Sequence, residues 1–296
     1  MTTPKILALQ TPAKINFVLE LLKKREDGFH DLKLIFQAVD LWDQLTFEKR
    51  DEGVRFKVVE GPTELPDDAR NIIVQAAVKF INEVLCGQGG VAITLRKHIP
   101  VAAGLGGGSS DAAAVLLGMD RLFATQVYPE ELHDMASELG SDVAFFLYGG
   151  TALGEGRGEK ITRLPPMPSL DLVLVKPDSG LSTQEVYKSG LGEFSPGRLA
   201  SALGDILATG DKAKIGRSLH NGLERAAFHL QPLCLDLKME LKQAGALGAL
   251  VSGSGPTVFG IAESHDHAHQ IAQKINKKGR KVFVTKTIPD GVKFTS

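Results

Sequence analysis

A glycine-rich loop constrains this chain more than any other feature of its sequence. Four of the five residues from Gly104 to Gly108 are glycine. Alternation of apolar residues over 91–99 predicts a strand before the loop, and the Ala/Leu-rich run over 110–123 predicts a helix after it. Glycine lets the backbone take positive φ and approach a ligand closely, at a cost in conformational entropy. A strand, a glycine loop and a helix in this order therefore favour ligand binding.

The start of the helix after this loop suits an anion, because its N–H groups and the helix dipole favour negative charge. Phosphate is the obvious anion, and Ser109 and Ser110 could add hydroxyl donors or reach a bound Mg²⁺. No lysine follows Gly108 as a P-loop requires, and the sixth residue from Gly104 is not the glycine of a dinucleotide site. The Gly-x-Ser-x-Gly pattern of an esterase is absent. A flexible loop with helix-capping residues remains the alternative.

The chain mixes strands and helices without a regular strand–helix–strand alternation, which predicts an α+β fold. Residues 13–21 alternate like a half-buried strand, with Lys14 and Asn16 on its polar face. Helical segments dominate 182–243. Further strands are predicted at 31–39, 44–49, 53–59, 170–175, 247–251, 257–262 and 281–287, and further helices at 71–85, 129–140, 143–148 and 266–277.

The length suggests two domains, at about 150 residues each. The composition changes at 149–158, where glycine is frequent, and a proline-rich run follows at 165–168. We therefore expect the boundary near 155–165, which gives an N-terminal domain of residues 1–160 and a C-terminal domain of residues 161–296.

Charge and composition exclude several classes of protein. The formal net charge is −1, without the basic excess of a nucleic-acid binder. Two cysteines form no disulfide framework, and no apolar run is long enough to span a membrane. We expect a cytoplasmic protein, and a monomer or weak homodimer. The histidines at 265, 267 and 269 look like a metal tract, but the pattern that follows them favours the solvated start of a helix.

Three segments, in order, resemble the motifs of the GHMP kinases. These are Thr11–Phe17 (TPAKINF), Pro100–Ala114 (PVAAGLGGGSSDAAA) and Val251–Gly260 (VSGSGPTVFG). The resemblance implies two α+β domains with an active site in the cleft between them, and ATP as phosphoryl donor, with Mg²⁺ whose ligands we do not assign. The residues it places around the nucleotide are Pro100, Val101, Ala102, Ala103, Gly104, Leu105, Gly106, Gly107, Gly108, Ser109 and Ser110.

One branch of these kinases fits best, because Asp27–Leu32 (DGFHDL) follows the first motif as it does in the enzymes that phosphorylate 4-diphosphocytidyl-2-C-methyl-D-erythritol. The resemblance implies transfer to the 2-hydroxyl of that substrate, in non-mevalonate isoprenoid synthesis. The implied partner is thus a small molecule with a cytidine diphosphate group. Two alternatives are another GHMP kinase, such as a homoserine kinase, and a sensor that binds nucleotide and sugar without catalysis.

The resemblance also gives roles to two charged residues. Lys14 would lie beside the reacting hydroxyl and stabilise negative charge on its oxygen. Asp142 would orient that hydroxyl and accept its proton. Without the resemblance, Lys14 would be a solvated surface residue, and Asp142 would cap the helix that follows it.

Four further residues would hold the substrate. Asn16 shares the polar face with Lys14. Phe29 would stack on cytosine and His30 would hydrogen-bond it, although a core aromatic and a surface histidine are the plain alternative. The family usually has tyrosine where this chain has Phe29, which keeps the ring but loses the hydroxyl. Tyr187 is a second candidate for stacking, by its position after the Ser182–Glu185 capping box.

Overall fold

The computed structural model describes residues 6–62 and 65–295, which build two β-sheets with helices packed against them. The first sheet contains β1 (Ile6–Lys24), β2 (His30–Arg50), β3 (Glu52–Glu60), β4 (Gly89–Arg96), β5 (Thr151–Gly156), β6 (Lys160–Arg163), β8 (His220–Asn221) and β12 (Lys293–Phe294). The second contains β7 (Asp171–Pro177), β9 (Gly248–Val251), β10 (Val258–Ala262) and β11 (Arg280–Lys286). The predicted α+β class is confirmed.

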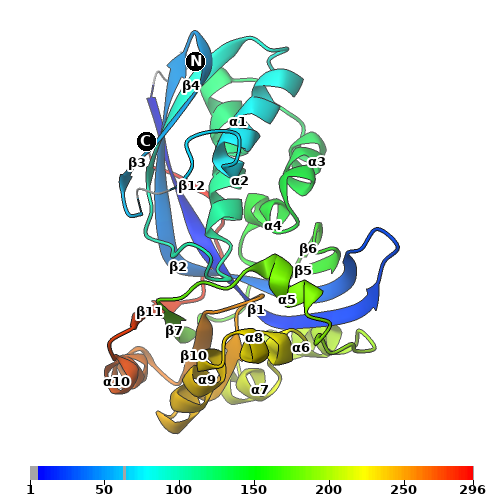
Figure 1. Cartoon of the computed structure of the whole chain (residues 1–296), viewed down its shortest axis with the longest axis vertical. Coiled ribbons are helices and arrows are strands. Elements are labelled where there is room, and N and C mark those ends of the chain that lie inside the picture. Colours follow the sequence, from blue (N-terminus) through cyan, green and yellow to red (C-terminus); the bar gives the residue numbers. More distant parts are fainter. Residues whose placement is uncertain (1–5, 63–64, 296) are drawn as a thin grey trace.

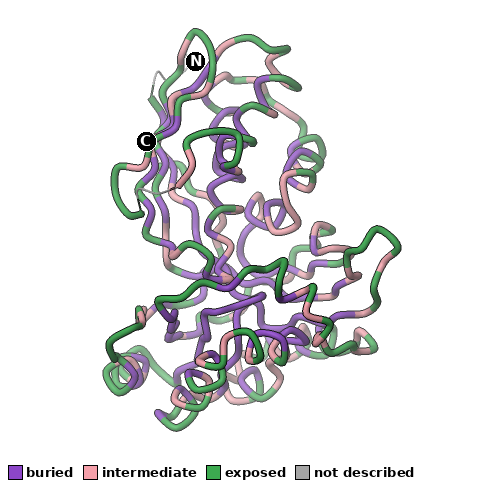
Figure 2. Tube along the Cα trace, in the orientation of Figure 1, coloured by how far each residue is buried: buried purple, intermediate pink, exposed green. Residues whose placement is uncertain are grey.

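Four helices accompany the first sheet and lie along one of its faces (Figure 1). They are α1 (Ile72–Glu83), α2 (Gly107–Phe123), α3 (Pro129–Leu139) and α4 (Val143–Tyr148). In the C-terminal half, α7 (Lys212–Arg217), α8 (Glu224–Leu230), α9 (Leu233–Gln243) and α10 (His265–Ile275) pack against the second sheet, whereas α6 (Leu199–Leu207) contacts β1 and β2, and α5 (Thr183–Lys188) contacts α8. Buried residues concentrate between each sheet and its helices (Figure 2).

The strand order in the first sheet is β12-β1-β2-β4-β3, and β5 and β8 pair with β2 and β1, respectively. The second sheet runs β11-β7-β10-β9 and is antiparallel throughout. The chain returns to the first sheet at its end, where β12 pairs with β1, and β8 pairs in parallel with β1. These pairings join the two halves of the chain through β1.

The prediction of a half-buried strand over 13–21 is wrong in two respects. Both faces of β1 are buried from Thr11 to Leu21, including the polar residues Lys14, Asn16 and Glu20. The register against β2 also shifts between Asn16 and Val18, as a β-bulge produces. Phe17 therefore packs in one hydrophobic cluster and Leu19 in another.

Most helix starts follow the sequence signals. The side chain of Asn71 caps α1 by accepting a hydrogen bond from Ile73 N, and Pro129 opens α3. α2 begins at Gly107, earlier than predicted, because Gly106 takes the left-handed conformation that precedes it. β6 still pairs with β5, and the second sheet begins at Asp171, so the division at residue 160 stays a prediction.

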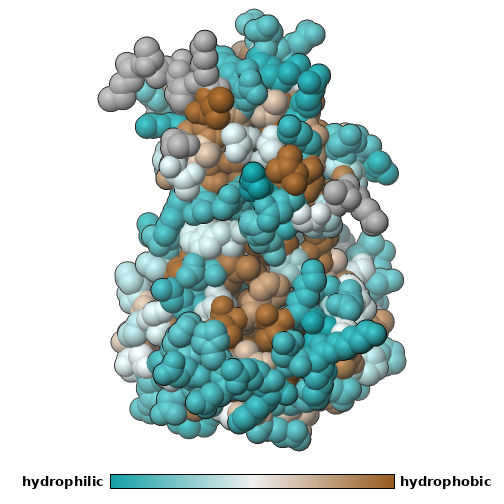
Figure 3. All heavy atoms as spheres, turned by 90° about the vertical axis from the view of Figure 1, so that its left-hand side faces the viewer, coloured by the Kyte–Doolittle hydropathy of each residue, from teal (hydrophilic) through white to brown (hydrophobic). Residues whose placement is uncertain are grey.

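The surface facing the viewer in Figure 3 is hydrophilic over most of its area, with hydrophobic patches between polar side chains. Among the described residues, no helix combines the length and apolar composition needed to cross a bilayer.

Candidate active site

A cleft of 1030 Å³ brings together nearly all the residues singled out in the sequence. Its lining comes from β1, the β1–β2 turn, the loop before α1, the glycine loop, the start of α4, α5 and the loop after β9. The predicted residues that line it are Lys14, Asn16, Phe29, His30, Asp142, Tyr187 and every residue from Pro100 to Ser109.

Ser110 is the exception among the predicted residues. Its hydroxyl is fully buried, donates to the Pro12 carbonyl at 2.5 Å and contacts the Thr11 hydroxyl. Its amide donates to the Gly106 carbonyl within α2. Ser110 therefore ties α2 to β1 and does not present its hydroxyl to the cleft, whereas Ser109 does line it.

Lys14 lies at the centre of the site. Its side chain is only 4% exposed, and its Nζ atom lies 3.2 Å from Asp142 Oδ2 and donates to Asn16 Oδ1 at 2.8 Å. The ammonium also lies 5.7 Å from the centre of the Phe36 ring. A buried lysine needs such a partner, because an unpaired charge away from water is costly. Lys14 is thus fixed toward the cleft and is not a solvated surface residue.

Asp142 occupies the N-cap position of α4, yet its side chain makes no capping hydrogen bond. Its carboxylate is 34% exposed and faces Lys14. The alternative role of Asp142, as a cap of the following helix, is therefore not supported by a hydrogen bond.

The glycine loop is held against Lys14 and against the loop after β9, which carries the third motif. Lys14 N donates to the Leu105 carbonyl at 2.9 Å, and Ser252 Oγ donates to the Gly104 carbonyl at 3.0 Å. Gly106 has φ +69°, and a Cβ there would lie 2.8 Å from the Phe146 ring and 2.9 Å from Lys14 Cγ. The close packing requires glycine at this position. The turn at Gly106 also directs the N-terminus of α2 to the cleft, where its first amides have no partner within the helix.

The loop after β9 approaches the same lysine. Gly253 has φ +58°, and a Cβ there would lie 3.1 Å from Lys14 Nζ. Asn221 Nδ2 donates to the carbonyls of Val251 and Gly253, which fixes the loop. Asn16 Nδ2 is buried and has no hydrogen-bond partner among the described residues, so its donor is available to a ligand in the cleft.

An aromatic cluster forms another part of the lining. The His30 ring lies 5.5 Å from the Tyr187 ring and 5.9 Å from that of Phe194. Phe29 is 53% exposed, and the guanidinium of Arg157 lies 5.2 Å from its ring centre. An exposed aromatic ring beside a cation is not a core residue, and it offers a flat surface to a ligand.

Two titratable groups of this cluster stay neutral near pH 7. Burial, with a smaller effect of Lys24, lowers the pKa of His30. Burial, with the nearby charge of Asp142, raises the pKa of Tyr187. A neutral imidazole can both donate and accept a hydrogen bond.

Arg157 and a buried charge cluster were not predicted from the sequence. Arg157 lies between Gly156 and Gly158, in a run interpreted as a domain junction. In the cluster, Lys97 Nζ contacts the carboxylates of Asp43 and Asp111, the latter at 2.8 Å. Burial raises the pKa of Asp111 to about 8, although Lys97 opposes this. No local pattern in the sequence joins Asp43 to residues so distant in the chain.

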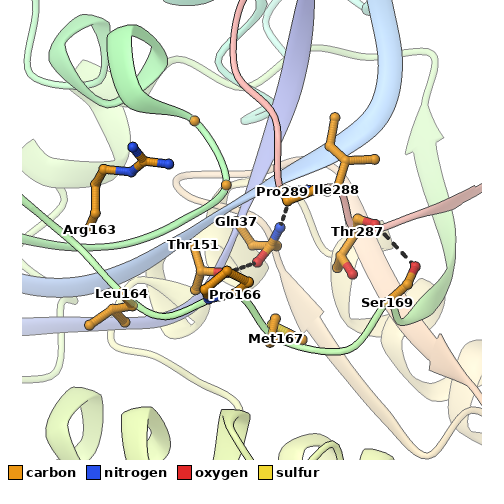
Figure 4. Close-up of a pocket in the computed structure, with 12 residues that line it drawn as sticks. Gln37, Thr151, Arg163, Leu164, Pro166, Met167, Ser169, Thr287, Ile288 and Pro289 are labelled. Atoms are coloured by element: carbon orange, nitrogen blue, oxygen red, sulfur yellow. Dashed lines mark hydrogen bonds between the residues drawn. The ribbon is translucent and has the colours of Figure 1, made fainter.

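Another cavity, of 210 Å³, lies where two of the connections between the sheets pass, the one from β6 to β7 and the one from β11 to β12 (Figure 4). Gln37 donates to the carbonyls of Ala38 and Ile288 and accepts from Thr151, and Ser169 donates to the Thr287 carbonyl. These polar groups are satisfied within the protein, so they tie the connections together and give no sign of a ligand.

Two family models match the chain. The model of the GHMP kinase N-terminal domain matches residues 71–150, and that of the C-terminal domain matches residues 200–281. A protein of Pelotomaculum thermopropionicum named 4-diphosphocytidyl-2-C-methyl-D-erythritol kinase is 43% identical over 280 residues, which are 93% of this chain and 96% of that protein. The protein of the same name from Moorella thermoacetica is 42% identical over 289 residues, 96% and 99% of the two chains.

Solved structures agree in fold. A crystal structure of 4-(cytidine 5'-diphospho)-2C-methyl-D-erythritol kinase gives a TM-score of 0.80 at 34% identity and covers 95% of this chain and 99% of that one. A homoserine kinase from Cytophaga hutchinsonii also gives 0.80, at 24% identity, with coverage of 100% and 99%. Because the two scores are equal, the fold does not discriminate between these substrates, and the lining of the cleft must do so.

Proposed function

Because the chain belongs to the GHMP kinase family, we propose that it transfers the γ-phosphoryl group of ATP to the 2-hydroxyl of 4-diphosphocytidyl-2-C-methyl-D-erythritol, a step in non-mevalonate isoprenoid precursor synthesis. Near-full-length relatives bear the name of this kinase. The observation that carries the choice of substrate is the aromatic cluster around His30, which lines the same cleft as Lys14 and Asp142.

The cytosine ring of the substrate is assigned to this cluster. Phe29 and Tyr187 offer ring faces for stacking, and neutral His30 offers hydrogen bonds to the base. Arg157 stands against Phe29 and carries a positive charge that suits the diphosphate. Homoserine is small and has no base or diphosphate, so these four side chains would have no function in a homoserine kinase.

Lys14 and Asp142 are assigned to the phosphoryl transfer. The hydroxyl oxygen of the substrate forms a bond to the γ-phosphorus while the bond from that phosphorus to the β–γ bridging oxygen breaks. The hydroxyl proton passes to Asp142, and ADP leaves. Lys14 stabilises the negative charge on the attacking oxygen, and the amides at the start of α2 hold the phosphates. In a loose transition state, the positioning of the hydroxyl counts for more than the basicity of Asp142.

Mg²⁺ is assigned to the nucleotide rather than to a cage of protein ligands. No group of three or more His, Cys, Asp or Glu residues in the described parts of the chain could hold a metal ion. Mg²⁺ in kinase sites is usually held by substrate phosphates, water and one or two carboxylates. Ser109, which lines the cleft at the start of α2, could add its hydroxyl to that set, and the ion would neutralise phosphate charge. We also assign the protein to the cytoplasm, where a reaction that consumes ATP can proceed.

The test is an ADP-release assay that compares 4-diphosphocytidyl-2-C-methyl-D-erythritol with homoserine and mevalonate. We expect turnover with the first substrate, and inhibition of that turnover by CDP in competition with the substrate. Faster turnover with homoserine would replace the substrate assignment while keeping the kinase. Absence of turnover with all three, with ATP still bound, would favour the non-catalytic sensor.

A further inference from the structure

Two histidines on the outer face of the second sheet's helix layer lie in the geometry of a metal-binding pair. His265 and His269 are one turn apart on α10, and their Nε2 atoms are 3.1 Å apart. Both side chains are exposed, and neither lines the cleft. Figure 1 shows α10 at the edge of the molecule, away from α1–α4. The proposed kinase reaction makes no use of this pair.

The distance between the nitrogens suits one shared metal ion. Histidine nitrogen binds Zn²⁺ at about 2.0–2.1 Å. For an ion at that distance from both Nε2 atoms, the Nε2–ion–Nε2 angle would be roughly 100°. That angle lies between those of octahedral and tetrahedral coordination. Two histidines in this spacing on one helix face are also the metal-binding part of the His-x-x-x-His pattern.

The helix holds the pair in place. Ser264 caps α10 by accepting a hydrogen bond from His267 N, and Ala268, Ile271 and Ile275 anchor its inner face. The two imidazole rings are therefore positioned by a fixed backbone, and an ion would have to order only their side-chain torsions.

A carboxylate lies on the other side of the His265 ring. Asp171 Oδ1 is 4.0 Å from Nδ1 of His265, and Lys212 Nζ holds the other oxygen of Asp171 at 3.2 Å. The carboxylate therefore adds negative charge near the pair, which favours a bound cation. The two Nε2 atoms are within hydrogen-bonding distance of each other, and a shared ion would replace that contact.

We propose that His265 and His269 form a site for one borderline divalent transition-metal ion, of the class of Zn²⁺, Ni²⁺ or Cu²⁺, with water in the remaining positions. Imidazole prefers these ions to Mg²⁺ and Ca²⁺, which prefer oxygen ligands. The site is separate from the Mg²⁺ that accompanies ATP. With two protein ligands, it is a site of moderate affinity, and it stabilises the folded chain because the pair is assembled only in the helix.

His267 supplies a matched control within the same tract. Its Nδ1 accepts a hydrogen bond from Glu263 N at 3.2 Å, and its Nε2 faces the turn at Gly245. It is thus turned away from the pair. His267→Ala removes one histidine of the tract and leaves both proposed ligands.

The experiment is a titration of the full chain with Zn²⁺ at pH 8, by calorimetry, with thermal unfolding as a second readout. We expect one ion per chain, binding at least tenfold weaker in His265→Ala and in His269→Ala, and binding within about twofold of wild type in His267→Ala. Zn²⁺ should raise the unfolding temperature of wild type, and equal Mg²⁺ should not. No saturable binding, or an equal loss in His267→Ala, would overturn the proposal. Turnover in His269→Ala should equal that of wild type.

Discussion

The Nζ atom of Lys14, on β1, lies 3.2 Å from Oδ2 of Asp142, at the start of α4, and only the aspartate is appreciably exposed. The cation is thus fixed behind the carboxylate by the strand, by Asn16 and by the Phe36 ring. Preorganised charge of this kind costs no reorganisation when a reaction develops negative charge beside it. Substitutions at this pair should therefore affect phosphoryl transfer more than ATP binding.

Replacing Asp142 with asparagine should lower kcat by about 10²–10⁴-fold, the range of a positioned general base. The amide keeps the shape but cannot accept the hydroxyl proton. The KM for ATP should stay within about threefold, because the phosphates are assigned to the start of α2. Steady-state kinetics and direct ATP binding check both parts. Asp134→Asn, on the exposed face of α3, serves as the control and should turn over like wild type. A near-normal kcat in Asp142→Asn would remove this residue from the mechanism.

Replacing His30 with alanine should raise the KM for the cytidyl substrate at least tenfold and leave the KM for ATP unchanged. The loss follows from the hydrogen bonds assigned to its neutral ring, each worth about 1–1.5 kcal/mol. Because burial lowers the pKa of His30, wild-type KM should also be constant between pH 7 and 8. Phe29→Tyr keeps the stacking surface and should change KM by less than about threefold. An unchanged KM in His30→Ala would contradict the cytosine assignment.

Gly106→Ala should destabilise the fold by about 2–4 kcal/mol, from the left-handed φ and the overpacking against Phe146. Gly108→Ala is the matched control, because its Cβ would meet only Ile72 Cγ2, at 3.6 Å, and its φ is not positive. Its free energy of unfolding should stay within about 1 kcal/mol of wild type. Urea unfolding measures both, and equal effects of the two substitutions would contradict the packing described for the loop.

The stability of the Asp111→Asn variant, relative to that of wild type, should increase as the pH rises. Asp43 already neutralises Lys97 and accepts from the amides of His98 and Ile99, so Asp111 is a surplus buried carboxyl. Its pKa is raised to about 8 when folded, from about 3.9 when unfolded, so the folded state binds more protons across this window. The stability that this group gives to wild type is therefore lost progressively between pH 4 and 8, and the loss is complete above pH 8.

The asparagine variant has no such titration, so the difference in free energy of unfolding, variant minus wild type, should rise by roughly 1–3 kcal/mol from pH 6 to pH 9. Urea unfolding at several pH values follows it. A difference that is constant with pH, or that falls, would contradict the charge assignment in this cluster.

Local signals in the sequence were sufficient for most elements. Asn71 and Pro129 mark helix starts by chemistry that acts over a few residues, and the helix over 266–277 follows from an apolar pattern that outweighs its histidines. The glycine loop follows its strand as predicted, although Gly107 and Gly108 belong to α2, and its contact with Lys14 explains why glycine is needed at Gly106.

Features that depend on distant parts of the chain were not predictable in this way. Groups far along the chain bury the polar face of β1, because Lys14 faces Asp142, and Glu20 accepts hydrogen bonds from Ser195 and Ala200. The bulge near Val18 also exchanges the two faces, so a pattern of alternation alone gave the wrong burial. Ser110 faces β1 because α2 begins at Gly107, one turn before the predicted start. Arg157 enters the cleft only because β5 pairs beside the turn that carries Phe29.

The most direct test of the account is to follow the reaction of ATP with 4-diphosphocytidyl-2-C-methyl-D-erythritol by phosphorus NMR. We expect one new monoester resonance, coupled to the carbon that bears the 2-hydroxyl, formed in equal amount to ADP, and absent with Asp142→Asn. ADP formed without a phosphorylated cytidyl product, or a product phosphorylated at another hydroxyl, would contradict it.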